Sequence, residues 1–254
     1  MHAAALGLAA SGMVAALTWV ASVTRRDVSI VDSTWSVLVL APACVAWVVL
    51  PQPGPRATVV LLLAALWAVR LAVYITWRHW GHDEDPRYGE IRARNEPHFV
   101  WKSLYLVFGL QALLGWIVSM PLIGAVASDA PWGWLDALGS AVFVFGFAIE
   151  AVADRQLARF KAEPSNRGRV MAEGLWRYSR HPNYFGEFCV WWGLWLVALS
   201  AGAWWSVASP LLMTVLLLKV SGVTLLEKHI GERRPAYRAY VARTNAFFPW
   251  KPRA

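Results

Sequence analysis

The chain has little charge for its size, and this scarcity excludes most soluble architectures. Only 16% of its 254 residues are charged and 57% are hydrophobic, whereas charged residues make up about 25% of an ordinary soluble domain. The two cysteines are too few for a disulfide framework or a cysteine metal site. The 18 glycines form neither G-x-G-x-x-G nor G-x-x-x-x-G-K, so a Rossmann site and a P-loop are not expected.

Long apolar runs are what the sequence does contain, and they predict an all-α polytopic membrane protein with seven transmembrane helices. The runs cover about residues 3–23, 33–50, 57–77, 102–121, 133–153, 185–203 and 205–222. Several Trp residues stand at the ends of these runs, as is typical of the membrane–water interface: Trp77, Trp80, Trp101, Trp132 and Trp134. We expect a single membrane domain over 1–254, with a cytoplasmic tail over 223–254.

The positive residues indicate the orientation of the bundle. Arg56 is the one Lys or Arg in the segments that follow the second, fourth and sixth runs, and Arg70 lies inside the third run. The remaining Lys and Arg lie in the other connecting segments and the tail, which the positive-inside rule assigns to the cytoplasm. The N-terminus is therefore expected outside. We attribute the net charge of +8 to cytoplasmic loops, anionic lipid or an anionic small molecule, not to nucleic acid.

Ionisable groups beside the apolar runs are the first candidates for function, because such groups are costly at membrane depth. Glu150 and Asp154 are spaced i,i+4 and share one helix face. Either hydrogen-bond donors on a ligand or loop cations such as Arg155 and Arg159 would offset their repulsion. The segment 155–180 carries seven cations, which suit either bound phosphate or a solvated positive-inside loop.

A dense polar cluster follows at the expected start of the sixth run. Pro182 predicts the beginning of a helix, and Asn183 and Glu187 then share a face at i,i+4. Other polar residues crowd the same place, and the beginning of a helix suits anions: Arg177, Tyr178, Arg180 and His181. So many polar groups beside an apolar span favour a binding site over a purely structural role.

The run from Ser179 to Glu187, Ser-Arg-His-Pro-Asn-Tyr-Phe-Gly-Glu, resembles the signature of the steroid 5-alpha-reductase family, in particular its bacterial branch. The resemblance extends over most of the chain through shorter motifs: Arg26-Asp27-Val28-Ser29-Ile30-Val31-Asp32, Arg70-Leu71, Asp85-Pro86-Arg87-Tyr88, Asp154-Arg155-Gln156-Leu157, and Ser221-Gly222 to Glu227. It implies a seven-helix reductase of a bacterial plasma membrane. Such an enzyme uses NADPH to reduce a carbon–carbon double bond conjugated to a carbonyl in a lipid-like substrate.

The resemblance also implies roles for individual residues. Asp154, Arg169, Asn183 and Glu187 match nucleotide-binding positions of the family, and Glu150 stands where the family uses an amide. His229 falls near a tail histidine close to the cofactor, and Asp32 matches a catalytic carboxylic acid. The full set of candidate cofactor-binding residues is Glu150, Asp154, Arg169, Tyr178, Arg180, His181, Asn183, Glu187 and His229.

One departure from the family concerns the reacting carbonyl. Trp67 stands where the reductases have a catalytic tyrosine, and an indole donates one hydrogen bond but is a poor general acid. Tyr74 lies two turns further on, on the same helix face as Trp67 and Arg70. Asp32, Arg70 and Tyr74 are therefore the candidate catalytic residues, and a steroid is not implied as substrate.

Three other interpretations remain open. The residues Arg180-His181-Pro182-x-Tyr184-x-Gly186, with a later Glu227, also resemble isoprenylcysteine carboxyl methyltransferases, which act on lipidated substrates with S-adenosylmethionine. A non-catalytic lipid-binding or transport protein is the second alternative. The third is a metal site in the loop from His79 to Asp85, for which a solvated interfacial loop is the preferred interpretation; we expect no metal. The sequence leaves the oligomeric state open.

Overall fold

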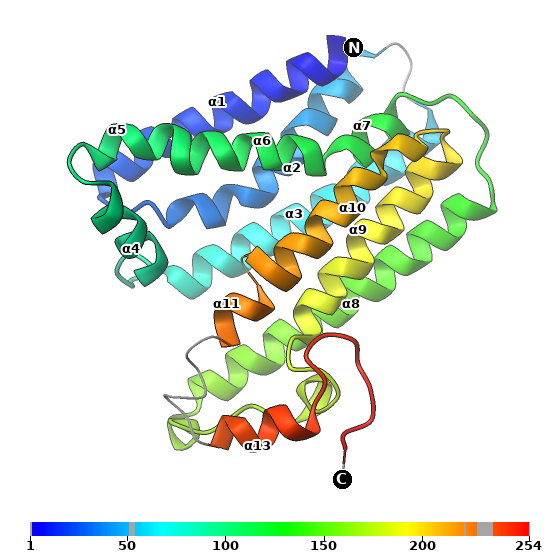
Figure 1. Cartoon of the computed structure of the whole chain (residues 1–254). Helices are drawn as coiled ribbons and strands as arrows, with labels where there is room; N and C mark the ends of the chain where they lie inside the picture. The colour runs from blue at the N-terminus through cyan, green and yellow to red at the C-terminus, as the bar shows by residue number, and fades with distance from the viewer. Residues whose placement is uncertain (1, 51–53, 221, 228–235, 254) are drawn as a thin grey trace. The chain divides into compact units, whose positions relative to one another are not determined.

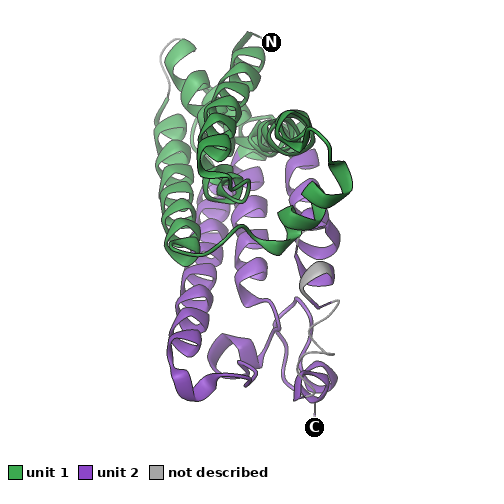
Figure 2. Ribbon diagram, turned by 90° about the vertical axis from the view of Figure 1, so that its left-hand side faces the viewer, with its two compact units in different colours: residues 1–133, 198–206 green, residues 134–197, 207–254 purple. Residues whose placement is uncertain are grey.

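The computed structural model describes residues 2–50, 54–220, 222–227 and 236–253, and every regular element in these ranges is helical (Figure 1). Two compact units are distinguished in Figure 2: unit 1 comprises residues 1–133 and 198–206, and unit 2 comprises residues 134–197 and 207–254. The single-domain expectation stays a prediction, and each unit is described by itself.

Unit 1 contains the first four expected spans. Its elements are α1 (His2–Arg25), α2 (Ile30–Val49), α3 (Pro55–His79), α4 (Pro86–Asn95), α5 (Phe99–Ser103), the π-helical turn Leu104–Gly109, α6 (Leu110–Val118) and α7 (Met120–Val126). The fourth apolar run ends earlier than expected, at Val118, and a new helix starts at Met120. Pro121 explains the break, because proline lacks the N–H that would continue the helix.

Unit 2 contains the later helices. Its elements are α8 (Trp134–Ala162), 3-10 turns over Pro164–Asn166 and Gly174–Arg177, α9 (Pro182–Ser200), α10 (Ala208–Val215), a π-helical turn over Leu216–Val220, α11 (Val223–Glu227) and α13 (Ala236–Arg243). A 3-10 turn over Trp204–Val207 leads into α10. Helix α9 begins at Pro182, as the sequence predicts, and the end of α9 belongs to unit 1.

Helices occupy all seven predicted apolar ranges, but five helical stretches are both long and apolar enough to be candidate membrane spans: α1, α2, α3, Phe99–Val118 and α8. The helix over Trp204–Val220 is apolar but shorter. The five Trp residues at the ends of the apolar runs are all exposed, which fits contact with the membrane interface. The chain is thus an all-helical integral membrane protein.

Small residues form the packed face of α1, whereas its large residues point outward. Gly7, Ser11 and Ala15 are buried, while Met13 and Leu17 are largely exposed. In Figure 1, α1, α2 and α6 run side by side, consistent with their many mutual contacts. Small residues inside and large residues outside is the pattern of helices surrounded by lipid, where close backbone approach replaces the hydrophobic driving force.

Candidate functional site

Two glycine pairs hold α8 and α9 of unit 2 against each other. A Cβ atom on Gly146 would lie 2.5 Å from the backbone oxygen of Gly186, and one on Gly139 would lie 2.6 Å from that of Gly193. The two glycines on each helix are seven residues apart, so they face the neighbouring helix together. This contact fixes the register between the last turns of α8 and the first turns of α9, where the predicted site lies.

The predicted acidic residues are brought together at this end of the helix pair. Glu150, Asp154 and Glu187 are all buried, and the side-chain amide of Asn183 donates a hydrogen bond to Asp154 Oδ1 at 3.1 Å. The side-chain oxygen of Asn183 is buried and has no hydrogen-bond partner among the described residues. An orphaned buried acceptor is costly, and a ligand group with hydroxyl or amide donors would satisfy it.

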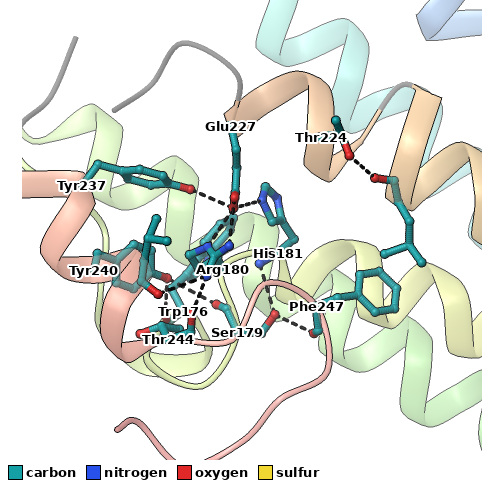
Figure 3. Close-up of polar contacts among 12 residues, drawn as sticks. Trp176, Ser179, Arg180, His181, Thr224, Glu227, Tyr237, Tyr240, Thr244 and Phe247 are labelled. Carbon is teal, nitrogen blue, oxygen red and sulfur yellow. Dashed lines mark hydrogen bonds and ion pairs between the residues drawn. The ribbon is translucent and has the colours of Figure 1, made fainter. Parts of the chain in front are cut away.

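Arg180 does not point toward this acidic group but belongs to a second cluster, drawn in Figure 3. Its guanidinium donates to both carboxylate oxygens of Glu227, at 2.7 Å from Nε and 2.8 Å from Nη2. His181 Nε2 lies 2.9 Å from Glu227 Oε1, and the Tyr237 hydroxyl donates to the same oxygen at 3.1 Å. Four donor atoms from three residues therefore converge on one carboxylate. We call Glu227 and these three residues the Glu227 cluster.

The electrostatics of the Glu227 cluster favour a permanently ionised carboxylate. Burial alone would raise the pKa of Glu227, but the hydrogen bonds from His181 and Arg180 and the Arg180 charge outweigh it and lower the pKa to about 2. Burial and the neighbouring Glu227 charge raise the pKa of the Tyr237 phenol. Because an ionised carboxylate only accepts hydrogen bonds, Nε2 of His181 is the donor.

The C-terminal segment wraps around the residues that precede α9. The Ser179 hydroxyl donates to the Phe247 carbonyl at 2.7 Å, and the Arg180 backbone N–H donates to the Asn245 carbonyl at 2.8 Å. The Tyr240 hydroxyl donates to the Trp176 carbonyl. These bonds position the start of α9 and, through it, the side chains of His181 and Asn183.

The cationic segment between α8 and α9 remains largely at the surface. Arg169 is exposed and donates to the Asn166 side chain at 3.0 Å, and Tyr178 is also exposed. The other exposed cations of the segment are Arg155, Arg159, Lys161, Arg167 and Arg177. Exposed arginines are suited to meeting the phosphates of a ligand.

In unit 1, Asp32 is held by two residues of α4. Arg87 donates to Asp32 Oδ2 at 2.8 Å, and the Tyr88 hydroxyl donates to Asp32 Oδ1 at 2.6 Å. Arg87 also donates to Asp85, at 3.0 Å from Nε. Burial by itself would lower the pKa of Arg87, but Asp85 and Asp32 raise it overall; burial and Asp32 raise the pKa of the Tyr88 phenol.

The two other candidate catalytic residues lie together on α3. The Arg70 guanidinium lies over the Tyr74 ring, 5.5 Å from its centroid, and Arg78 lies over the same ring at 5.7 Å. Both Arg70 and Tyr74 are partly exposed, whereas Trp67 is fully buried. The structure therefore brings Arg70 and Tyr74 into contact on the helix face that the spacing predicts.

Some predicted residues do not join a cluster, and some cluster members escaped prediction. His229 lies outside the described residues. His79 Nε2 lies 3.9 Å from Asp85, and no metal-binding group of three ligands is found in the described ranges. Arg87, Tyr88 and Tyr237 were not singled out as site residues. The Asp85-Pro86-Arg87-Tyr88 motif was the available signal for the first two, whereas nothing in the local pattern marks Tyr237.

Fold and geometry together define an integral membrane protein with ionisable clusters in both of its units. The chain belongs to the family described as protein of unknown function DUF1295, whose model matches residues 18–244. That family includes steroid 5-alpha-reductase-like membrane proteins. The chain is 26% identical over 285 residues to the uncharacterized protein C594.04c of the fission yeast Schizosaccharomyces pombe, covering 96% of this chain and 79% of the relative. No solved structure matches the chain.

Proposed function

We propose that the chain is an NADPH-dependent membrane reductase of a carbon–carbon double bond conjugated to a carbonyl in a lipid-like substrate. The observation that carries the proposal is the Asp154–Asn183 pair, whose buried amide oxygen lacks a partner in the described ranges. It is accompanied by the buried carboxylates of Glu150 and Glu187. Buried acceptors of this kind suit the hydroxyl and carboxamide donors of a nucleotide cofactor.

The residues of unit 2 fit such a cofactor in charge as well as in hydrogen bonding. Asp154, Asn183, Glu150 and Glu187 would accept hydrogen bonds, and Arg169 with its neighbouring exposed cations would meet phosphates. NADPH, when bound, supplies the reducing hydride, while the protein supplies position and electrostatics. In this proposal, the Glu227 cluster holds the start of α9, and with it Asn183, in place.

In unit 1, we assign Arg70 and Tyr74 to stabilising negative charge on the carbonyl oxygen. Asp32 accepts hydrogen bonds from Arg87 and Tyr88, and we assign it to positioning these two side chains. Donors aimed at a developing oxyanion are usually the largest electrostatic contribution to such a reaction. Tyr74 carries the hydroxyl that Trp67 lacks, and the Arg70 guanidinium lies over its ring. The Tyr88 hydroxyl donates its hydrogen bond to Asp32 and so helps to orient this carboxylate.

We further propose seven membrane crossings, with the N-terminus outside and the C-terminus in the cytoplasm of a bacterial plasma membrane. Helix α9 and the helix over Trp204–Val220 supply the two crossings beyond the five long apolar stretches. The distribution of Lys and Arg supports this orientation. NADPH would then reach unit 2 from the cytoplasm.

A membrane methyltransferase that uses S-adenosylmethionine is the second candidate. The observation in its favour is the Glu227 cluster, because it joins the Arg180-His181 pair to a distant glutamate, the combination by which the chain resembles that family. The exposed cations of 155–169 favour the reductase instead, because a sulfonium cofactor has no phosphate to neutralise.

Ligand binding in detergent separates these candidates. NADPH, NADH and S-adenosylmethionine are compared by thermal shift, since a ligand at about a hundredfold excess over its Kd stabilises the folded state by about 2.7 kcal/mol. A shift with NADPH alone supports the reductase and leads to a screen of unsaturated lipids. A shift with S-adenosylmethionine alone supports the methyltransferase. No shift with any of the three contradicts both and favours a lipid-binding or transport role.

Point variants test the proposed site itself. Asn183→Ala and Glu187→Gln are expected to weaken NADPH binding while the protein remains folded. Glu90→Gln is the matched control, because Glu90 lies exposed on α4 and pairs with Arg94 on the same helix at 3.4 Å. Unchanged affinity in both site variants would remove the Asp154–Asn183 pair from the proposal.

A further inference from the structure

A basic and aromatic surface of unit 2 is formed where the residues before α9 meet the C-terminal segment. The Trp250 N–H donates to the Tyr178 carbonyl at 2.9 Å and joins these two stretches, while the Arg253 N–H donates to the Arg243 carbonyl at 2.9 Å within the C-terminal segment. We call the exposed residues gathered here the basic–aromatic surface: Arg177, Arg243, Phe248, Trp250, Lys251 and Arg253.

The aromatic residues of this surface are exposed although their backbone is fixed. The Trp250 side chain is among the most exposed large apolar groups, at 72%, and Phe248 is also exposed. In a water-soluble domain, most large aromatic side chains are buried. A segment that is hydrogen-bonded in place and still presents Phe and Trp outward therefore needs a partner that covers them.

Phe248 packs against the first turns of α9. Its ring contacts those of Phe185 and Phe188 in the first two turns of α9, at centroid distances of 6.0 Å and 5.8 Å. The aromatic residues of the C-terminal segment therefore continue the apolar surface of a helix that enters the bundle. That is the level at which Trp and neighbouring cations meet the lipid headgroups.

The charges of the basic–aromatic surface have a single sign. It carries four cations, and neither 174–184 nor 236–253 contains an acidic residue. Near an anionic membrane surface, each Lys or Arg strengthens attachment by about fivefold. The surface includes residues 248–253, which lie beyond the part of the chain that the family model matches.

We propose that the basic–aromatic surface docks on the anionic phospholipid headgroups of the bilayer in which the chain is embedded. Trp250 and Phe248 enter the interface, and the four cations contact lipid phosphates. The attachment holds the C-terminal segment, which in turn bonds to Ser179 and Arg180. This proposal does not depend on the identity of the cofactor or the reaction.

Collisional quenching in reconstituted full-length protein tests the proposal. Lys251→Cys is labelled with a nitrobenzoxadiazole fluorophore in a Cys44→Ala/Cys189→Ala background, in vesicles of phosphatidylcholine with or without phosphatidylglycerol. We expect strong quenching by a headgroup-labelled nitroxide lipid in the anionic vesicles and weak quenching by aqueous iodide. Ala162→Cys is the control, because the exposed end of α8 lies about 42 Å along the helix from Trp134, beyond the hydrocarbon core.

Charge variants and competing ligands complete the test. Replacing Arg177, Arg243 and Arg253 with Gln is expected to reduce lipid quenching of the Lys251→Cys label by at least about fivefold. Iodide quenching equal to that at Ala162→Cys would overturn the proposal, as would lipid quenching that is unaffected by these substitutions and by removal of phosphatidylglycerol. Protection from iodide by an RNA oligonucleotide, without lipid quenching, would overturn it in favour of nucleic acid.

Discussion

The two units each contain a carboxylate held by an arginine and a tyrosine, but the two clusters are built differently. In unit 2, Glu227 receives both nitrogens of the Arg180 fork, and the Arg180 side chain is only 9% exposed. In unit 1, Asp32 receives a single nitrogen of Arg87, whose side chain is 38% exposed and is shared with Asp85. The first cluster is closed on itself, whereas the second is divided between two acids.

This difference indicates which cluster is structural. The Glu227 oxygens accept hydrogen bonds from Arg180, His181 and Tyr237, and Arg180 also donates to the Thr244 carbonyl. A saturated carboxylate of this kind fixes the chain around it and has little capacity left for a ligand. Arg87 bonds to Asp85 as well as to Asp32, so it can leave Asp32 and still have an acidic partner. The surroundings of Asp32 can therefore rearrange at a lower cost in free energy. The comparison assigns stability to the Glu227 cluster and adaptability to the Asp32 cluster.

Removing the charge of Glu227 is the strongest way to test this assignment. Glu227→Gln leaves the buried Arg180 guanidinium without its bidentate partner, so the free energy of unfolding is expected to fall by about 3–5 kcal/mol. Thermal or denaturant unfolding in detergent measures the loss. The exposed substitution Glu90→Gln provides the control. A loss below about 1 kcal/mol, the size of a surface ion pair, would contradict the structural role.

Acidification should act on the same cluster. The pKa of Glu227 is about 2 in the folded chain, below its ordinary value of 4.5. The stabilisation is therefore complete above pH 4.5 and is lost as the pH falls toward 2, because the unfolded chain binds the proton first. Allowing for the partly exposed side chain, we expect a loss of about 2 kcal/mol. The pH dependence of unfolding should flatten in Glu227→Gln; an unchanged slope would assign the acid sensitivity to other carboxylates.

Much of the fold could be predicted from the sequence because apolar length is a local property. Each predicted range contains a helix, and the start of α9 at Pro182 was predicted from proline geometry. Helix α8 extends to Ala162, beyond the predicted apolar range 133–153. Its last turns are polar, so the length of the apolar run does not predict them. The number of membrane crossings stays a prediction, since α9 begins with polar residues and the last apolar helix is short.

The part of the candidate site that follows from local helical spacing could also be predicted from the sequence. Asn183 and Asp154 were each found from helical spacing, and their contact follows from the glycine pairs of α8 and α9. Arg180 was predicted to bind a cofactor, but its guanidinium contacts Glu227, a residue 47 positions away in the chain. Such a pairing depends on tertiary folding, and a single sequence contains no periodic signal for it.

Asp32→Asn tests the adaptable cluster and should cost less than Glu227→Gln. Arg87 keeps its bonds to Asp85, and the new amide oxygen can still accept from Tyr88, so only the charge-assisted hydrogen bond from Arg87 is lost. We expect the free energy of unfolding to fall by about 1–2 kcal/mol. Unfolding in detergent again provides the measurement. A loss as large as that of Glu227→Gln would show that both clusters are structural and would end the distinction between them.

Removal of the tyrosine hydroxyls compares the two clusters most directly and should have the smallest effect on the free energy of unfolding. Tyr237→Phe deletes one of the four donors on Glu227, and Tyr88→Phe deletes one of the two donors on Asp32. Each change removes a hydrogen bond to a carboxylate, about 1 kcal/mol. Because the Glu227 cluster retains Arg180 and His181, Tyr237→Phe should have the weaker effect, even though Glu227→Gln has the stronger one. Unfolding of the two single variants, and of Tyr237→Phe combined with Glu227→Gln, provides the measurement. Because the two residues are coupled, the double variant should be less destabilised than the sum of its two single variants. Strict additivity would mean that the Tyr237 hydroxyl does not act through Glu227.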